Sequence, residues 1–255
     1  MNTNPQGTVN TTLKNGVAYI EFAHPAHNAM PSPQLARLAQ AIQEAGLNPD
    51  AKVIVLSSGG NRTFCAGASF DELLAIEDFD TGKAFFMGFA NVINAMRTCP
   101  KFIIGRVQGK AVGGGVGLAS ATDFCVSTQY ASVKLSELAL GIGPFVVGPA
   151  VERKIGNAAF SAMSIDAADW RSAQWAKEKG LFAEVFDDVT QMDEYIDTLA
   201  QKLTGYSPEA MAELKKVFWA GTENWNRLLP ERAAISGRLV LSDFTKNFIS
   251  KFKAK

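Results

Sequence analysis

Three consecutive glycines, Gly113 to Gly115, interrupt an apolar stretch in the segment GKAVGGGVGLAS, residues 109–120. Glycine packs no side chain and loses the most backbone freedom on folding, so a buried helix or strand gains nothing from it. A strand that runs through a glycine turn into a helix leaves free N–H groups at the helix start, and these groups suit a developing negative charge. The run therefore predicts a place where bare backbone meets a ligand.

Two phosphate-binding motifs do not fit this run. A dinucleotide site needs the spacing Gly-x-Gly-x-x-Gly, and a motif starting at Gly113 would need glycine where the chain has Leu118. A P-loop would end in Gly-Lys-Ser or Gly-Lys-Thr, which is absent here. Close packing is the plain alternative for the run taken alone.

A second loop, RTFCAGAS at residues 62–69, has the same organisation. It follows a buried strand, contains Gly67 beside small residues, and leads into the helical segment FDELLAI. Two such loops can each direct one backbone N–H at a common point. Paired donors aimed at a developing oxyanion stabilise acyl-group chemistry, so the two loops together predict an oxyanion site.

Glu137, in SVKLSELALGIGPFVVGPA, is the carboxylate that could serve such a site. Apolar and glycine residues follow it, with no adjacent cation. A surface glutamate or a helix cap is the plain reading. The functional reading is a carboxyl enclosed against Phe145, Val146 or Val147, where desolvation would raise its pKa and let it accept and return a proton near neutrality.

Other reaction classes lack their residues. His24 and His27 form a His-x-x-His pair without nearby Cys or carboxylate ligands, so no metal site is expected. The chain has no Gly-x-Ser-x-Gly nucleophile turn. Cys65 flanks the second loop but, as a small buried hydrophobe, needs no catalytic role.

The chain as a whole has 255 residues, 47% of them hydrophobic, and its 25 basic and 25 acidic residues give no net charge. These values fit one large globular domain and predict neither nucleic acid nor a membrane as partner. Cys65, Cys99 and Cys125 form no Cys-x-x-Cys pair, which fits a reducing compartment. Because no signal pattern opens the chain, we expect a cytoplasmic protein; an organellar protein that has lost its targeting segment is the alternative.

Strands and helices alternate along most of the chain, which predicts an α/β fold. Asn15-Gly16 between two apolar segments predicts a hairpin. The other expected strands cover residues 52–58, 101–107, 123–128 and 131–136, and the expected helices cover residues 31–46 and 80–100 and begin again at Gly148-Pro149. Strand signals vanish from about residue 190. We therefore expect a core at residues 1–195 and a helical region at residues 196–255.

The helical region is rich in large apolar side chains, namely Phe218, Trp219, Trp225, Leu228 and Leu229. Packing against the core and packing against another subunit explain them equally well. Ser207 before Pro208 is the expected N-cap of one of these helices.

In this order and spacing, RTFCAGAS, GKAVGGGVGLASATD and LSELALGIGP resemble the crotonase (enoyl-CoA hydratase/isomerase) superfamily. The segment HPAHNA is similar to its P-x-x-x-NA segment with one residue fewer. The resemblance spans nearly the whole chain. It implies a spiral of ββα units, and a C-terminal helical region that joins subunits into homotrimers or hexamers. It also implies a coenzyme A thioester as the substrate, with no separate cofactor.

The resemblance implies roles for individual residues. The two oxyanion donors fall on the backbone N–H groups of Ala68 and Gly114, beside Glu137 as the acid/base group. Ala66 lies in the loop expected to contact the adenine of CoA. The residues expected to contact the substrate are Cys65, Ala66, Gly67, Gly113, Gly117, Phe145 and Val146.

The chain departs from the superfamily pattern in three ways. Gly117 stands where two-carboxylate hydratases carry Glu, so only Glu137 is retained. Ser69 and Asp71 replace a frequent Asp and a CoA-facing Lys, and PFVVGPA is shorter and bulkier than the usual glycine-rich segment. Contacts to the CoA phosphates are therefore expected from the tail, at Lys251, Lys253 or Lys255.

One carboxylate supports several reactions through a thioester enolate. It can move a proton from Cα to Cγ, which isomerises an enoyl-CoA, or deliver water to the double bond when another group orients that water. We expect an enoyl-CoA hydratase with a single catalytic carboxylate, and a delta-isomerase is the close alternative. An acyl-CoA hydrolase and a non-catalytic CoA-binding subunit are further alternatives. HPAHNA and the shortened GPFVVGPA are similar to the methylglutaconyl-CoA hydratase subgroup.

Overall fold

The computed structural model describes the backbone of residues 7–253 and the side chains of residues 7–250. Its strands are β1 (Thr8–Lys14), β2 (Val17–Ala23), β3 (Val53–Ser58), β4 (Thr63–Cys65), β5 (Ile103–Val107), β6 (Lys110–Val112), β7 (Phe124–Thr128), β8 (Ser132–Lys134), β9 (Arg171–Ser172) and β10 (Glu184–Phe186). Its helices are α1 (Ser32–Leu47), α2 (Phe70–Leu74), α3 (Phe79–Thr98), α4 (Gly114–Ala121), the 3-10 helix η1 (Leu138–Leu140), α5 (Gly148–Ile165), α6 (Ala173–Glu178), α7 (Val189–Thr204), α8 (Pro208–Phe218), α9 (Trp225–Leu239) and α10 (Asp243–Lys253).

The strands form a large sheet of order β1-β2-β3-β5-β7-β10 and a small sheet of order β4-β6-β8-β9. Three successive strand pairs, β3–β4, β5–β6 and β7–β8, each place one strand in the large sheet and the next in the small sheet before the chain turns into a helix. This repeat is the predicted spiral of ββα units. The small-sheet strands β4 and β6 did not stand out in the sequence, because three residues are too few to show a periodicity.

The expected hairpin is confirmed. Strands β1 and β2 pair antiparallel from Thr8↔Ala23 to Lys14↔Val17. Asn15 and Gly16 form its turn with φ of 50° and 79°, the left-handed region that this tight turn demands.

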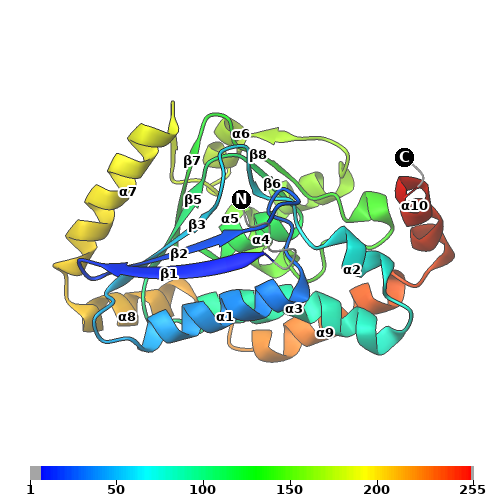
Figure 1. The fold of residues 1–255 in the computed structure, drawn as a ribbon, viewed down its shortest axis with the longest axis horizontal. Coiled ribbons are helices and arrows are strands. Elements are labelled where there is room, and N and C mark those ends of the chain that lie inside the picture. Colours follow the sequence, from blue (N-terminus) through cyan, green and yellow to red (C-terminus); the bar gives the residue numbers. More distant parts are fainter. Residues whose placement is uncertain (1–6, 254–255) are drawn as a thin grey trace.

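Both faces of the large sheet are covered, which explains the nearly unbroken apolar run of β3. Ile54 and Leu56 face the main core with α1 and α3, whereas Val53 and Val55 face a second cluster under α7. Figure 1 shows α7 on one side of the sheet and the parallel row of α1, α3 and α9 on the other.

The helical region packs largely against its own chain. Helix α9 lies along α3, and their backbones meet at two glycines: a Cβ on Gly82 would lie 2.9 Å from the carbonyl oxygen of Gly237. Trp225 and Leu229 are buried in the main core, while Phe218 is 45% exposed. The expected boundary at residues 195 and 196 falls inside α7, so the first part of the helical region covers the core sheet. Helix α10 stands at one end of the molecule, next to η1 (Figure 1).

None of the described helices combines the length and apolar composition that crossing a bilayer requires.

Candidate active site

The small sheet brings three functional segments to one edge. Strands β4, β6 and β8 are parallel neighbours, so their carboxyl ends lie side by side. The chain leaves β4 into the loop of Ala68, β6 into the glycine turn before Gly114, and β8 into the turn that carries Glu137. Ligands in α/β sheets bind beyond such strand ends.

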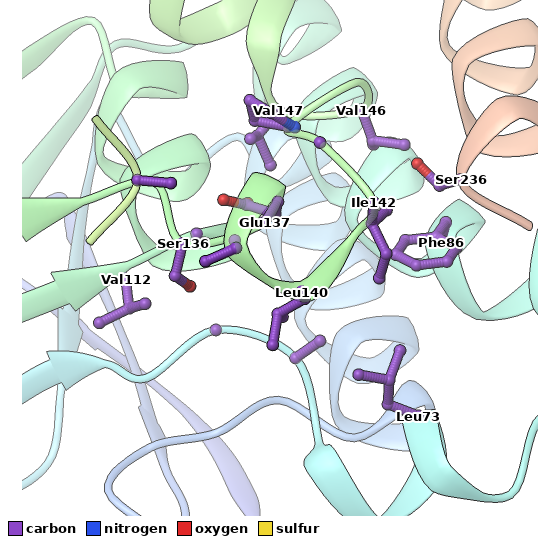
Figure 2. Close-up of a pocket in the computed structure, with 18 of the residues that line it drawn as sticks. Leu73, Phe86, Val112, Ser136, Glu137, Leu140, Ile142, Val146, Val147 and Ser236 are labelled. Atoms are coloured by element: carbon purple, nitrogen blue, oxygen red, sulfur yellow. The ribbon is translucent and has the colours of Figure 1, made fainter. Parts of the chain in front are cut away.

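A cavity of about 420 Å³ opens at this edge. Figure 2 shows Glu137 between Val112 and Ser136 on the small-sheet side and Ile142 and Phe86 on the other side. The predicted site residues that line the cavity are Ala66, Gly67, Ala68, Gly113, Gly114, Glu137, Phe145 and Val146.

The amide of Ala68 is directed by a single bridge to Met30. The N–H of Met30 donates to the carbonyl of Gly67 at 2.8 Å, and the N–H of Ser69 donates to the carbonyl of Met30 at 3.2 Å. Successive groups of an extended chain point in opposite directions, so the N–H of Ala68 points away from Met30, toward the β6 side. Within the described part of the chain it has no hydrogen-bond acceptor.

The amide of Gly114 belongs to the first residue of α4, whose N–H has no partner inside the helix. The loops of Gly67 and Gly114 are in contact, since a Cβ on Gly67 would lie 3.7 Å from the nitrogen of Gly114. A Cβ on Gly114 would lie 2.2 Å from Phe89, and one on Gly113 would lie 2.8 Å from Oε1 of Glu137. The glycines thus let an aromatic ring and a carboxyl approach the backbone closely.

Glu137 holds its carboxyl against this glycine turn. The residue as a whole is partly exposed, but its Oε2 atom is buried and has no hydrogen-bond partner among the described residues. Burial raises the pKa of Glu137 from its usual 4.5 to about 7. Such a carboxyl is close to half ionised at neutral pH and can therefore act as base and then as acid.

Gly117 does not line the cavity, which corrects its predicted contact with substrate. A Cβ on Gly117 would lie 2.5 Å from Cγ1 of Val147. Val147 lines the cavity and fills the space in which a side chain at position 117 would begin. The site therefore has an apolar wall at the position of the superfamily's other carboxylate.

Cys65 does not line the cavity either, although contact with substrate was predicted. Its side chain is buried, and burial raises the pKa of its thiol to about 12. The N–H of Gly67 donates to its Sγ at 3.4 Å, so Cys65 supports the loop from behind.

The far wall of the cavity consists of apolar side chains that no motif in the sequence marked as part of a site. Phe85, Phe86 and Phe89 of α3 line it together with Leu73 and Ile142. The spacing of Phe85 and Phe89 placed both rings on one helix face, but it did not show whether that face met the core or a ligand. This end can accommodate an apolar acyl chain.

Ser69 is a departure from the superfamily pattern, and Lys251, Lys253 and Lys255 are the predicted contacts to the CoA phosphates, of which Lys255 lies outside the described residues. The hydroxyl of Ser69 accepts from the N–H of Glu72 at 3.4 Å and caps α2, which accounts for a serine at this position. Lys251 and Lys253 belong to the last turn of α10, and their side chains lie outside the described residues.

The enoyl-CoA hydratase/isomerase family matches residues 12–247. The chain belongs to this family. Carnitinyl-CoA dehydratase of Salmonella agona (strain SL483) is 31% identical over 224 residues, 85% of this chain and 82% of that protein. The peroxisomal Delta(3,5)-Delta(2,4)-dienoyl-CoA isomerase of Arabidopsis thaliana is 27% identical over 223 residues, 81% of this chain and 78% of that protein. A solved structure of enoyl-CoA hydratase from Bacillus halodurans has a TM-score of 0.88 at 19% identity and covers 95% of this chain and 99% of that one.

Membership of the enoyl-CoA hydratase/isomerase family confirms the predicted crotonase superfamily and the prediction of an enzyme of this family. The names of both relatives contain an acyl-CoA, in agreement with a thioester as the substrate class.

Proposed function

We propose that this chain isomerises the double bond of an enoyl-CoA thioester. Glu137 moves the proton, and the amides of Ala68 and Gly114 bind the thioester oxygen. The observation that carries the proposal is the pairing of one enclosed carboxyl with the apolar wall at Val147. Among the described residues that line the cavity, Glu137 carries the sole carboxyl, so one carboxyl would both remove and return the proton.

Binding orients the thioester first. Its carbonyl oxygen accepts from the two free amides, which come from separate turns of the spiral and cost no reorganisation when charge develops. The apolar end at Phe85 and Phe86 takes the acyl chain. Coenzyme A enters only as part of the substrate, and no separate cofactor takes part.

Proton transfer then proceeds in two balanced steps. The Glu137 carboxylate removes a proton from Cα of a 3-enoyl thioester, and the electron pair of that C–H bond delocalises onto the thioester oxygen. The resulting dienolate collapses from the oxygen and takes the proton from Glu137 at Cγ. The product is the 2-enoyl thioester, and Glu137 regains its charge.

Hydration is the second candidate, and it is the activity favoured in the sequence analysis. The likeness to a carnitinyl-CoA dehydratase supports it. The hydroxyl of Ser136, which lines the cavity, would have to help Glu137 orient the water. The lack of a second carboxylate beside Val147 is why we place isomerisation first.

The test offers the enzyme a 3-enoyl-CoA and, separately, crotonyl-CoA, and reads the mass and double-bond position of each product. Isomerisation predicts conversion of the 3-enoyl-CoA to a 2-enoyl-CoA of unchanged mass. A product heavier by one water from crotonyl-CoA, with no conversion of the 3-enoyl-CoA, would replace isomerisation by hydration. Glu137→Gln is the control that ties either product to this site.

We also propose, on the superfamily resemblance, that the chain assembles into trimers or pairs of trimers through its helical region. Exposed apolar side chains on α8 and α10, Leu214, Val217, Phe218 and Phe244, are available for such contacts. Sedimentation at several concentrations tests this, and a monomer throughout would contradict it.

A further inference from the structure

The side chains of Lys110, Lys134 and Trp170 project from one face of the small sheet, beside the cavity. The register pairs Val112 of β6 with Lys134 of β8, and pairs Val133 with Arg171 of β9. Trp170, one residue before Arg171, therefore stands next to Lys134. Lys110, two residues before Val112, shares the same face because strand side chains alternate.

The three side chains form a compact basic and aromatic cluster. Nζ of Lys134 lies 4.7 Å, and Nζ of Lys110 lies 5.1 Å, from the centre of the Trp170 ring. Neither lysine takes part in an ion pair with a described carboxylate. Two acids flank the cavity residues Ala167 and Ala168: Asp166 is paired with Arg171 at 2.5 Å, and Asp169 is exposed and makes no ion pair with a described basic residue. Two like charges on one indole, without an anion between them, leave local positive charge to be neutralised by a ligand.

The cluster reaches the cavity through Lys134. Lys134 and Val112 line the cavity, together with Ala167 and Ala168 next to Trp170. Among the described residues, Lys134 is the sole basic side chain that does so. Its backbone is fixed beside the oxyanion turn, because the N–H of Gly113 donates to the carbonyl of Lys134 at 2.8 Å. Among the described residues, its ammonium has one hydrogen-bond partner, the carbonyl of Ala168 at the long distance of 3.5 Å.

We propose that Lys134, packed on Trp170 with Lys110 beside it, binds an anionic group of the thioester at the small-sheet end of the cavity. The opposite end is apolar at Phe85, Phe86 and Ile142, so a charge placed there would be desolvated without a partner. The shared chemistry is a carboxylate or phosphate oxygen held by an ammonium group. Its source is either a carboxylate at the end of the acyl group or a phosphate of coenzyme A.

This inference rests on the proposed function only in placing a thioester in the cavity, so the test measures binding instead of turnover. Calorimetry gives the Kd of three saturated thioesters: butyryl-CoA, glutaryl-CoA with its terminal carboxylate, and butyryl-pantetheine, which lacks all nucleotide phosphates. The proteins are the wild type, Lys134→Met, Lys134→Arg and Lys202→Met. Lys202 is exposed on α7, across the large sheet from the cavity, and serves as the matched control.

Lys134→Met keeps the stem that covers Trp170 and removes the charge. We expect it to weaken binding about 10-fold or more for the ester that carries the recognised anion, as for loss of one charged hydrogen bond. If only glutaryl-CoA binds more weakly, the recognised anion is the acyl carboxylate. If both CoA esters bind more weakly and butyryl-pantetheine does not, the recognised anion is a phosphate of coenzyme A. Lys134→Arg should retain the binding in either case.

Two results would overturn the proposal. One is a Kd for both CoA esters that matches the wild type in Lys134→Met. The other is an equal weakening of the binding of all three thioesters. Butyryl-pantetheine carries no anion, so weaker binding of this compound would report damaged packing. Failure of Glu137→Gln to affect turnover would contradict the proposed function and leave this binding result standing.

Discussion

The carboxyl groups of Asp123 and Glu137 are both enclosed, and they are held in opposite ways. Asp123, just before β7, accepts from Lys215 Nζ, Trp219 Nε1 and the N–H of Ile103, each at 2.8 Å. Glu137 leaves its Oε2 without any partner in the described part of the chain. Asp123 ties α8 to the core, whereas Glu137 faces a cavity beside two free amides.

The difference separates a structural from a chemical use of burial. A buried charge is tolerated when its hydrogen bonds are complete, and its removal then strands the partner. A buried carboxyl with incomplete hydrogen bonds is unfavourable for folding, and it is retained where a proton has to move. Opposite responses to substitution should therefore distinguish the two sites.

Glu137→Gln should show the largest effect. The amide fills the same space but cannot carry a proton, so kcat should fall by about 10³-fold or more while the thioester still binds. Steady-state turnover and calorimetric binding check the two parts. Turnover equal to the wild type would remove Glu137 from the mechanism.

Asp123→Ala should instead lower the free energy of unfolding by about 3–5 kcal/mol, because it leaves Lys215 charged and buried. The side chains of Lys215 and Asp123 are only 2% and 4% exposed. Urea denaturation measures the loss, and kcat per folded molecule should stay at the wild-type value. The double variant with Lys215→Met should recover part of the stability; no recovery would mean that the pair is not the cause.

The same Glu137→Gln variant should be more stable than the wild type at alkaline pH. As pH rises from 4.5, the unfolded Glu137 ionises first while the folded one keeps its proton to about pH 7, so wild-type stability falls across that interval and is constant above it. The gain should reach up to about 3 kcal/mol at pH 8 and vanish below pH 4.5. Denaturation curves of both proteins at pH 8 and below pH 4.5 measure this gain. An equal difference in the free energy of unfolding at the two pH values would show that ionisation of Glu137 is not the cause of the gain.

Gly114→Pro tests the oxyanion amide when compared with Gly114→Ala. Both substitutions place a Cβ against Phe89, but only proline removes the N–H. The proline variant should therefore be slower than the alanine variant by about 10²-fold. Equal kcat values in the two folded variants would show that this amide does not hold the thioester oxygen.

The sequence was most informative where chemistry depends on local backbone. Two glycine-containing loops, each leading from a strand to a helix, predicted a common point for two backbone N–H groups, and the superfamily resemblance assigned them to Ala68 and Gly114 beside Glu137. The orientation of Cys65 was not predictable, because β4 is three residues long and shows no alternation. Gly117 was expected to contact the substrate, but Val147 lines the cavity at this place instead. Val147 is thirty positions further along the chain, so no local sequence pattern reveals this packing.

The cluster of Lys110, Lys134 and Trp170 could not be predicted from the sequence for the same reason. Lys134 and Trp170 become neighbours through β9, a strand of two residues that has no sequence signature. The phenylalanines of α3 were visible as an apolar helix face, and only the tertiary structure divides that face between core and cavity.

The central claim, that Glu137 forms an enolate held by the amides of Ala68 and Gly114, is tested most directly by hydrogen exchange at Cα of butyryl-CoA in heavy water. This exchange needs no double bond and is common to isomerisation and hydration. Proton NMR should show exchange that rises with pH to a plateau above about pH 7 in the wild type and falls by about 10³-fold or more in Glu137→Gln. Exchange at the same rate in both proteins would contradict the account.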